Sequence, residues 1–179
     1  AKWFIEKRPE GGKVAVIEGQ PGVFAAVQRT DGFTATILES GKFEVVASVP
    51  GNWDRQLSYD AATNILNQHP DLIGFYANND GMALGVVEAV KAANLKDQVA
   101  VFGTDGISDA YASIRAGDLT GTVDSFAVMT GEVAMEVALR LVGGQDLPRV
   151  VATPQALITS ENVDRYSGEG VDLRAVLLE

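Results

Sequence analysis

The sequence predicts an α/β fold: an open parallel sheet, Rossmann-like or flavodoxin-like, with helices on both faces. Short runs rich in Val, Ile and aromatic residues alternate with helical spacing along the chain, as in β-α-β units. These runs are nearly continuous in apolar residues, which is typical of parallel strands covered by helices on both sides. The predicted strands are residues 14–18, 43–49, 72–77 and 99–103, and a short helix over residues 2–8 precedes them.

Capping signals define the two clearest helices. Asp54 is expected to cap a helix over residues 55–68, and Asn79 or Asp80 is expected to cap a helix over residues 82–93. Capping alone would explain both Asn79 and Asp80, because each side chain can accept a hydrogen bond from a first-turn amide. We assign the cap to Asp80 and a ligand-binding role to Asn79.

The pattern changes after Thr122. Residues 127–142 have helical spacing but are apolar on almost every side, with a single polar stripe. Such a helix needs cover on more than one side. Residues 150–159 are predicted to form a further strand, and residues 161–166 and a tail follow it.

Composition limits the classes of partner. The formal net charge is -10, so nucleic acid and anionic membranes would be repelled and a small-molecule partner is favoured. The chain has no cysteine and a single histidine, His69, which leaves little material for disulfides, thiolate catalysis or His-rich metal sites. We expect no cofactor and no metal. The start of the chain lacks the pattern of a signal peptide, which is compatible with a mature, truncated or cytoplasmic chain.

The candidate binding residues lie directly after the predicted strands. The four strand ends are followed by residues 18–22, 50–54, 78–80 and 104–106. Because ligands of open parallel sheets bind beyond the carboxyl ends of the strands, we expect these side chains to meet at one rim. An indole can stack on the C–H face of a sugar ring, and amides and carboxylates can bind its hydroxyl groups. The sequence therefore indicates a site for a polyhydroxylated ligand.

Two other kinds of site fit this rim less well. The loop of residues 19–22 lies between a strand and a helix, as a phosphate-binding loop does, but it lacks the Gly-Lys-Ser/Thr ending. Glu18 beside it would repel phosphate. Glu18 and Asp105 could also form a carboxylate pair for glycoside cleavage, an enzyme hypothesis that turnover of an aryl glycoside would support.

Four stretches resemble a known family, in order, over roughly residues 1–165. They are Gly19-Gln20-Pro21-Gly22 through Arg29-Thr30-Asp31-Gly32-Phe33, then Gly51-Asn52-Trp53-Asp54-Arg55, then Ala77-Asn78-Asn79-Asp80-Gly81-Met82-Ala83-Leu84-Gly85, and Val101-Phe102-Gly103-Thr104-Asp105-Gly106. They look like the ribose, allose and galactose-type periplasmic receptors of ABC transporters. The Asn-Asp-x-Met-Ala-Leu-Gly and Gly-x-Asp-Gly runs are fairly specific to this superfamily, whereas the Gly-x-x-Gly piece alone is weak.

The resemblance implies a fold, a function and a set of ligand residues. It implies a periplasmic binding protein-like I lobe that binds a monosaccharide or polyol reversibly, without catalysis, and passes it to the membrane subunits of an ABC sugar transporter. Carried over residue by residue, it implies Arg29 as the sugar-binding arginine, Trp53 as the stacking aromatic, Asn79 as the amide ligand and Asp105 as the carboxylate. Ser125 stands at the last hinge position, where related receptors usually have Gln or Asn. In an empty site, Arg29 and Asp105 are expected to pair with each other.

Length is the larger departure from the family pattern, because an amino-terminal lobe is missing. We expect residues 1–125 to form the carboxy-terminal sugar-binding lobe, and residues 126–165 to be the returning helix and strand that normally contribute to the other lobe. Residues 166–179 would be a tail. The apolar helix over residues 127–142 is expected to be covered by a second copy of the chain, by a separately supplied amino-terminal lobe, or by the tail.

The resemblance also implies a location and leaves one alternative function. The location is the periplasm, or the outer surface of a Gram-positive cell with a lipid anchor. The alternative is the effector-binding domain of a sugar-responsive transcription regulator, which shares this lobe. A basic helix-turn-helix would distinguish that class, and the sequence contains none.

Overall fold

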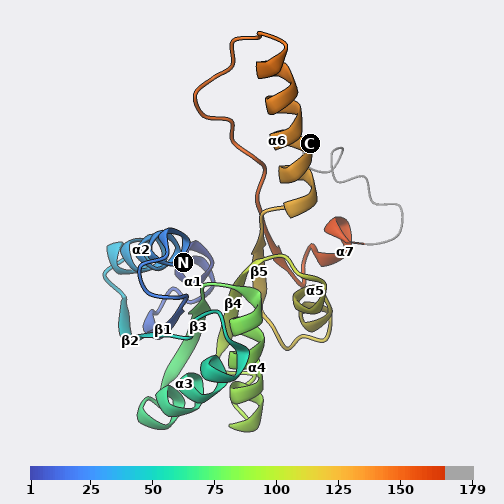
Figure 1. Ribbon diagram of the computed structural model, residues 1–179. Coiled ribbons are helices and arrows are strands. Elements are labelled where there is room, and N and C mark those ends of the chain that lie inside the picture. Colours follow the sequence, from blue (N-terminus) through green and yellow to red (C-terminus); the bar gives the residue numbers. More distant parts are fainter. Residues whose placement is uncertain (168–179) are drawn as a thin grey trace.

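The structure is a computed structural model that describes residues 1–167. The strands are β1 (Gly12–Glu18), β2 (Phe43–Pro50), β3 (Leu72–Ala77), β4 (Ala100–Asp105), β5 (Gly121–Asp124) and β6 (Ala156–Thr159). They form one sheet in the order β2-β1-β3-β4-β5-β6, in which β6 alone pairs antiparallel with its neighbour β5 (Figure 1). The predicted open parallel sheet is confirmed, except that its edge strand β6 is antiparallel.

The helices are α1 (Lys2–Lys7), α2 (Phe24–Glu39), α3 (Arg55–Gln68), α4 (Asp80–Ala92), α5 (Ser108–Arg115), α6 (Ala127–Val142) and α7 (Val163–Tyr166). Helices other than α6 cover both faces of the sheet, as predicted. Each face of the sheet carries its own hydrophobic core, and alternate residues of β1 point into one core or the other. Val14 and Val16 pack with aromatic residues of α1 and α2, whereas Ala15 and Ile17 pack with α3, α4 and α5.

The capping residue predicted for α3 is confirmed, whereas the one predicted for α4 is not. Asp54 caps α3, because its Oδ1 accepts the N–H of Leu57 at 2.8 Å. At α4 the side chain that caps is Asn79, whose Oδ1 accepts the N–H of Met82 at 2.8 Å. The assignment of the cap to Asp80 is therefore wrong. Asn79 stands just before the first helical residue with an extended backbone, which is the position from which a side chain reaches the third helical amide.

The strand predicted over residues 150–159 is shorter in the structure. Only Ala156–Thr159 pairs, because residues 143–155 form a long connection that leaves α6 and returns to the edge of the sheet. The strand β5 was not among the predicted strands. It is four residues long, too short to give a periodic pattern of its own.

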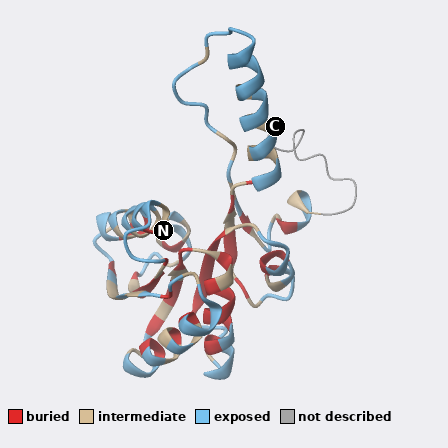
Figure 2. Cartoon of the chain, in the orientation of Figure 1, coloured by how far each residue is buried: buried red, intermediate tan, exposed pale blue. Residues whose placement is uncertain are grey.

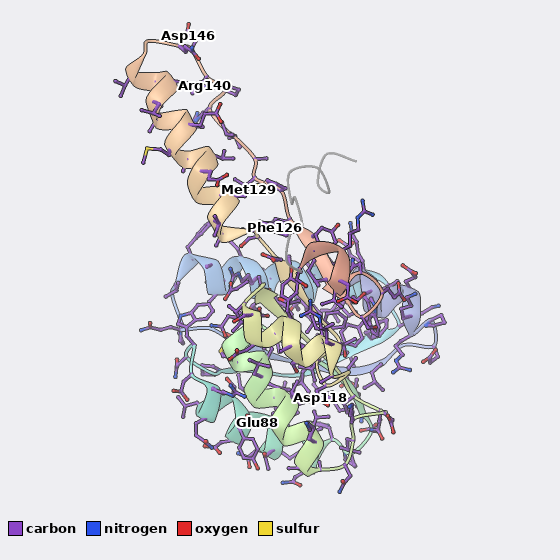
Figure 3. All side chains as sticks on the ribbon, turned by 90° about the vertical axis from the view of Figure 1, so that its right-hand side faces the viewer. Glu88, Asp118, Phe126, Met129, Arg140 and Asp146 are labelled. Atoms are coloured by element: carbon purple, nitrogen blue, oxygen red, sulfur yellow. The ribbon has the colours of Figure 1, made fainter. Side chains whose placement is uncertain are left out.

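The helix α6 projects away from the sheet (Figures 1 and 2). None of its residues is buried, and Val128, Met135 and Leu139 are 80%, 62% and 66% exposed. Figure 3 shows Phe126 at its base and Arg140 toward its far end. Within residues 1–167 the predicted need for cover is met only in part: Met129 packs against the core, and Val133 and Val137 face residues of the connection after α6. The tail proposed as one possible cover lies outside the described residues. Among the described helices, none is long and apolar enough to cross a membrane.

Candidate functional site

An ion pair between Arg29 and Asp105 marks the rim at the carboxyl ends of the strands. Arg29 lies on α2, and Asp105 is the last residue of β4. The guanidinium Nη2 is 3.2 Å from Oδ1 of Asp105, and Nη1 donates to the carbonyl oxygen of Asn78 at 2.7 Å. The side chains are 30% and 38% exposed, so a ligand can reach both. The predicted pairing of Arg29 with Asp105 is confirmed.

The surroundings of Asp105 make its carboxyl harder to ionise. Burial raises the pKa of Asp105 above its ordinary value of 3.8, Arg29 works against that shift, and the negative charge of Asp124 adds to it. The backbone is also unusual here, with a φ of 130°. A positive φ at a residue other than glycine costs free energy, so the surrounding structure has to hold it.

Asp80 supplies that support from beneath the rim. It is fully buried, and its Oδ2 accepts the N–H groups of Gly106 and Ile107 at 2.8 and 3.0 Å. Its Oδ1 accepts the hydroxyl of Thr122 on β5 at 2.6 Å. Burial raises the pKa of Asp80, and these three hydrogen bonds oppose the shift. Asp80 therefore fixes the loop that follows Asp105.

Trp53 lies over the end of β1. An added Cβ at Gly19 would come within 2.1 Å of the indole ring, so the ring rests directly on the glycine backbone. Asn52 and Trp53 both have positive φ, at 54° and 65°, a backbone conformation that is uncommon for residues other than glycine. The amide of Gly51 donates to the carbonyl oxygen of Glu18 at 2.7 Å and ties this loop to β1. The result is an aromatic platform at the rim.

Asn78 lies between these elements and was not among the residues predicted from the sequence to bind a ligand. It is fully buried, and its Oδ1 accepts the N–H of Gly19 at 2.9 Å and the hydroxyl of Thr30 at 3.2 Å. The only signal in the sequence was its place in the Ala-Asn-Asn-Asp run. Its neighbour Asn79 is partly exposed and uses Oδ1 for the helix cap, while the cap does not use its Nδ2.

Ser125 reaches the same edge through strand pairing. Asp105 and Asp124 are paired across β4 and β5, and Ser125 is the next residue. Its carbonyl oxygen accepts the hydroxyl of Thr130 at 2.9 Å, which ties it to the start of α6. The structure thus connects Arg29, Asp105, Trp53 and Asn79 through Asn78 and Gly19, and places Ser125 on the adjoining strand end.

The rim is open. A cleft of about 590 Å³ is lined by Arg29 and by residues mostly of α1, α2 and the sheet, among them the aromatic residues Trp3, Phe33, Tyr76 and Phe102. Trp53, Asn79, Asp105 and Ser125 do not line it. Of the five candidate residues, Arg29 is the one that borders this cleft.

The rival carboxylate pair has other partners. Glu18 accepts the hydroxyl of Ser48 on β2, and Asp105 pairs with Arg29. Within residues 1–167, no group of acidic and histidine side chains is arranged to hold a metal ion.

Comparison with known proteins gives the family. A family model described as a periplasmic binding protein domain matches residues 1–146. The chain is 41% identical to the D-allose-binding periplasmic protein of Escherichia coli K12 over 124 residues, which are 69% of this chain and 40% of that protein. It is 37% identical to the D-ribose/D-allose-binding protein of Pseudomonas aeruginosa over 162 residues, 88% of this chain and 50% of that protein.

A solved structure agrees. A periplasmic solute-binding protein of an ABC transporter from Actinobacillus succinogenes, with bound D-allose, matches with a TM-score of 0.86 and 33% identity, over 91% of this chain and 58% of that one. The chain therefore spans about half the length of the curated relatives it matches. With its fold, its motifs and these matches, the chain belongs to the family of type 1 periplasmic binding proteins that includes the ribose- and allose-binding proteins.

Proposed function

We propose that this chain binds a monosaccharide or polyol reversibly, as the carboxy-terminal lobe of the solute-binding component of an ABC sugar transporter. The observation that carries the proposal is the partly exposed pair of Arg29 and Asp105 at the rim. A guanidinium presents several fixed N–H donors, and a carboxylate accepts from two neighbouring hydroxyls. A ligand with adjacent hydroxyl groups can replace each partner of this pair.

Three further residues support a sugar as the ligand. Trp53 offers an aromatic face at the same rim, to which the C–H face of a sugar ring can bind. Asn79 keeps its Nδ2 available beside the cap, and Ser125 can donate and accept through its hydroxyl. We propose Arg29, Trp53, Asn79, Asp105 and Ser125 as the ligand-binding residues.

The division of the chain is part of the proposal. Residues 1–125 would form the sugar-binding lobe, residues 126–165 would contribute to a second lobe, and residues 166–179 would be a tail. The exposed apolar surface of α6 supports this division, because it is a surface in need of a partner. Closure of two lobes over the ligand would exclude water and strengthen the hydrogen bonds to its hydroxyls.

We further propose that the chain works in the periplasm, with the membrane subunits of a transporter as partners, and without catalysis. The relatives are binding proteins, and the first is named as periplasmic. These matches do not favour the alternative of an effector-binding domain in a transcription regulator. Turnover of an aryl glycoside by the pure protein would contradict the absence of catalysis.

Titration of tryptophan fluorescence with ribose, allose, galactose, xylose and inositol tests the function. The chain has two tryptophans, so a Trp3→Phe background assigns the signal to Trp53. We expect a saturable change that Trp53→Ala and Arg29→Ala both abolish. Arg55→Ala is the matched control, because Arg55 also forms an ion pair with a carboxylate, that of Glu88, but lies outside the site.

We expect this chain alone to bind sugar weakly, because one lobe supplies only part of the hydrogen bonds and contacts to the ligand. A second titration adds the amino-terminal lobe of the Escherichia coli relative in trans. Saturation in either titration supports the proposal. If neither shows a change with any sugar of the panel, the proposed site is wrong.

A further inference from the structure

We infer that Asn78 is the positioning residue of the rim: one buried side chain and its own backbone hold Arg29, the platform under Trp53 and the start of α4 in register. This inference rests on the proposed function, because it concerns the same site. It adds a residue that touches no ligand and sets the geometry of those that do.

Asn78 makes four hydrogen bonds, two to the end of β1 and the residue just beyond it, and two to α2. Its backbone N–H donates to the carbonyl oxygen of Ile17 on β1 at 2.9 Å, and its carbonyl oxygen accepts Nη1 of Arg29 at 2.7 Å. Its Oδ1 accepts the amide of Gly19 and the hydroxyl of Thr30. The side chain thus joins the end of β3 both to the end of β1 and to α2.

Three of these bonds bear on a proposed ligand residue. Gly19 carries the indole of Trp53 on its backbone, so a shift of Gly19 moves the platform. Thr30 is the residue next to Arg29 on α2, and Arg29 itself bonds to the Asn78 carbonyl. The following residue, Asn79, caps α4. Preorganised side chains bind more tightly, because less conformational freedom is lost on binding.

The amide nitrogen of Asn78 indicates that this position requires the side-chain oxygen and not the nitrogen. Its Nδ2 is buried and, within the described structure, has no hydrogen-bond partner. A buried donor without a partner is costly, so an asparagine at this position is explained by its acceptor. A side chain of the same shape that keeps the oxygen should therefore keep the function.

The test compares Asn78→Ala with Asn78→Asp in the full chain. Aspartate has the shape of asparagine, and either of its protonation states leaves an acceptor oxygen for Gly19 and Thr30. Hydrogen exchange at the Gly19 amide, followed by NMR, reports directly on the bond to Oδ1. In the Trp3→Phe background, the emission of Trp53 reports on the platform. Asn67→Ala, which removes an exposed amide from α3, is the control.

We expect Asn78→Ala to speed exchange at Gly19 about tenfold or more, to shift Trp53 emission to the red, and to weaken sugar binding about tenfold. Asn78→Asp should retain the protection of Gly19. Unchanged Gly19 exchange in Asn78→Ala would overturn the inference, and so would an equal loss in both variants, because a packing role does not distinguish them.

A second pair of variants covers the case in which Asn78→Ala fails to fold. In that case, the test uses Thr30→Val and Thr30→Ser instead. Thr30→Val removes one of the two donors to Oδ1 of Asn78, and Thr30→Ser keeps it. Faster Gly19 exchange in Thr30→Val only would support the inference, and identical exchange in both would overturn it. The exchange and emission measurements need no sugar, so they judge the role of Asn78 even if the proposed function fails.

Discussion

The phenolic hydroxyl of Tyr111 on α5 donates a hydrogen bond of 2.8 Å to Oδ2 of Asp124 at the end of β5. The other oxygen of Asp124 accepts the N–H of Phe126, where the chain turns from the sheet toward α6 with a φ of 47°. One carboxylate thus connects the helix that follows the Asp105 loop with the point at which α6 departs. Burial is the main cause that raises the pKa of Tyr111, and Asp124 adds to it, so the hydroxyl remains the donor at neutral pH.

This connection predicts two different losses of stability. Tyr111→Phe removes one donor and leaves an acceptor that still bonds to Phe126, so the free energy of unfolding should fall by about 1 kcal/mol. Asp124→Ala leaves two donors without a partner and the backbone of Phe126 unsupported, so the loss should be about 3 kcal/mol. Urea unfolding of the two variants measures both values. Equal losses would show that the bond to Phe126 contributes nothing.

The contact between Gly19 and Trp53 predicts the effect of a single methyl group. Gly19→Ala would place a Cβ about 2.1 Å from the indole, closer than any real contact, so the ring must move. We expect a shifted Trp53 emission and a loss of the sugar response. Gly32→Ala is the control, since a Cβ there meets nothing within 4 Å. A sugar response that survives Gly19→Ala would show that the indole does not stack on the ligand.

Much of the fold follows from local signals in the sequence. The apolar run over residues 72–77 and the helical pattern over residues 127–142 match β3 and α6 at both ends. Asp54 caps α3 as predicted, because an isolated capping residue before a periodic pattern has few alternatives.

What the sequence could not decide depended on tertiary contacts. Asn79 and Asp80 can both cap a helix, and only the loop of Gly106 and the hydroxyl of Thr122 show why Asp80 turns inward. The pairing of Arg29 with Asp105 could be expected from the family resemblance. The role of Asn78 could not, because its partners Gly19 and Thr30 are distant in sequence. The five proposed ligand residues remain a prediction.

The raised pKa of Asp105 predicts how sugar binding depends on pH. The ionised carboxylate accepts hydrogen bonds from hydroxyls, so affinity should fall on acidification through a pKa that lies above 3.8, by about tenfold for each pH unit below it. For folding the sign is opposite. Because the folded pKa lies above the unfolded value, ionised Asp105 costs stability, and protonation in this window relieves that cost. Wild-type protein should therefore lose affinity there without unfolding on account of Asp105.

Asp105→Asn provides the comparison for this pH dependence. The variant should bind sugar more weakly at neutral pH but without the acid-dependent loss, as measured by fluorescence titration between pH 7 and pH 4. Circular dichroism at each pH checks that the fold persists. The same acid-dependent loss in Asp105→Asn would assign the titration to another group.

The exposed face of α6 predicts association of the chain. Met135 and Leu139 are more than half exposed on a helix with no buried residue, and apolar surface of this extent is normally covered. We expect sedimentation to show self-association that increases with concentration. A separately supplied amino-terminal lobe should replace the second copy.

The double substitution Met135→Glu with Leu139→Glu should abolish both kinds of association, because it places two charges on the contact surface. Val27→Glu is a control on an exposed apolar residue of α2. Oxidation of the methionines by peroxide gives an independent reading, since association should protect Met135. A chain that is monomeric at all concentrations, with Met129 and Met135 inaccessible to peroxide, would contradict association and leave the tail as the cover of α6.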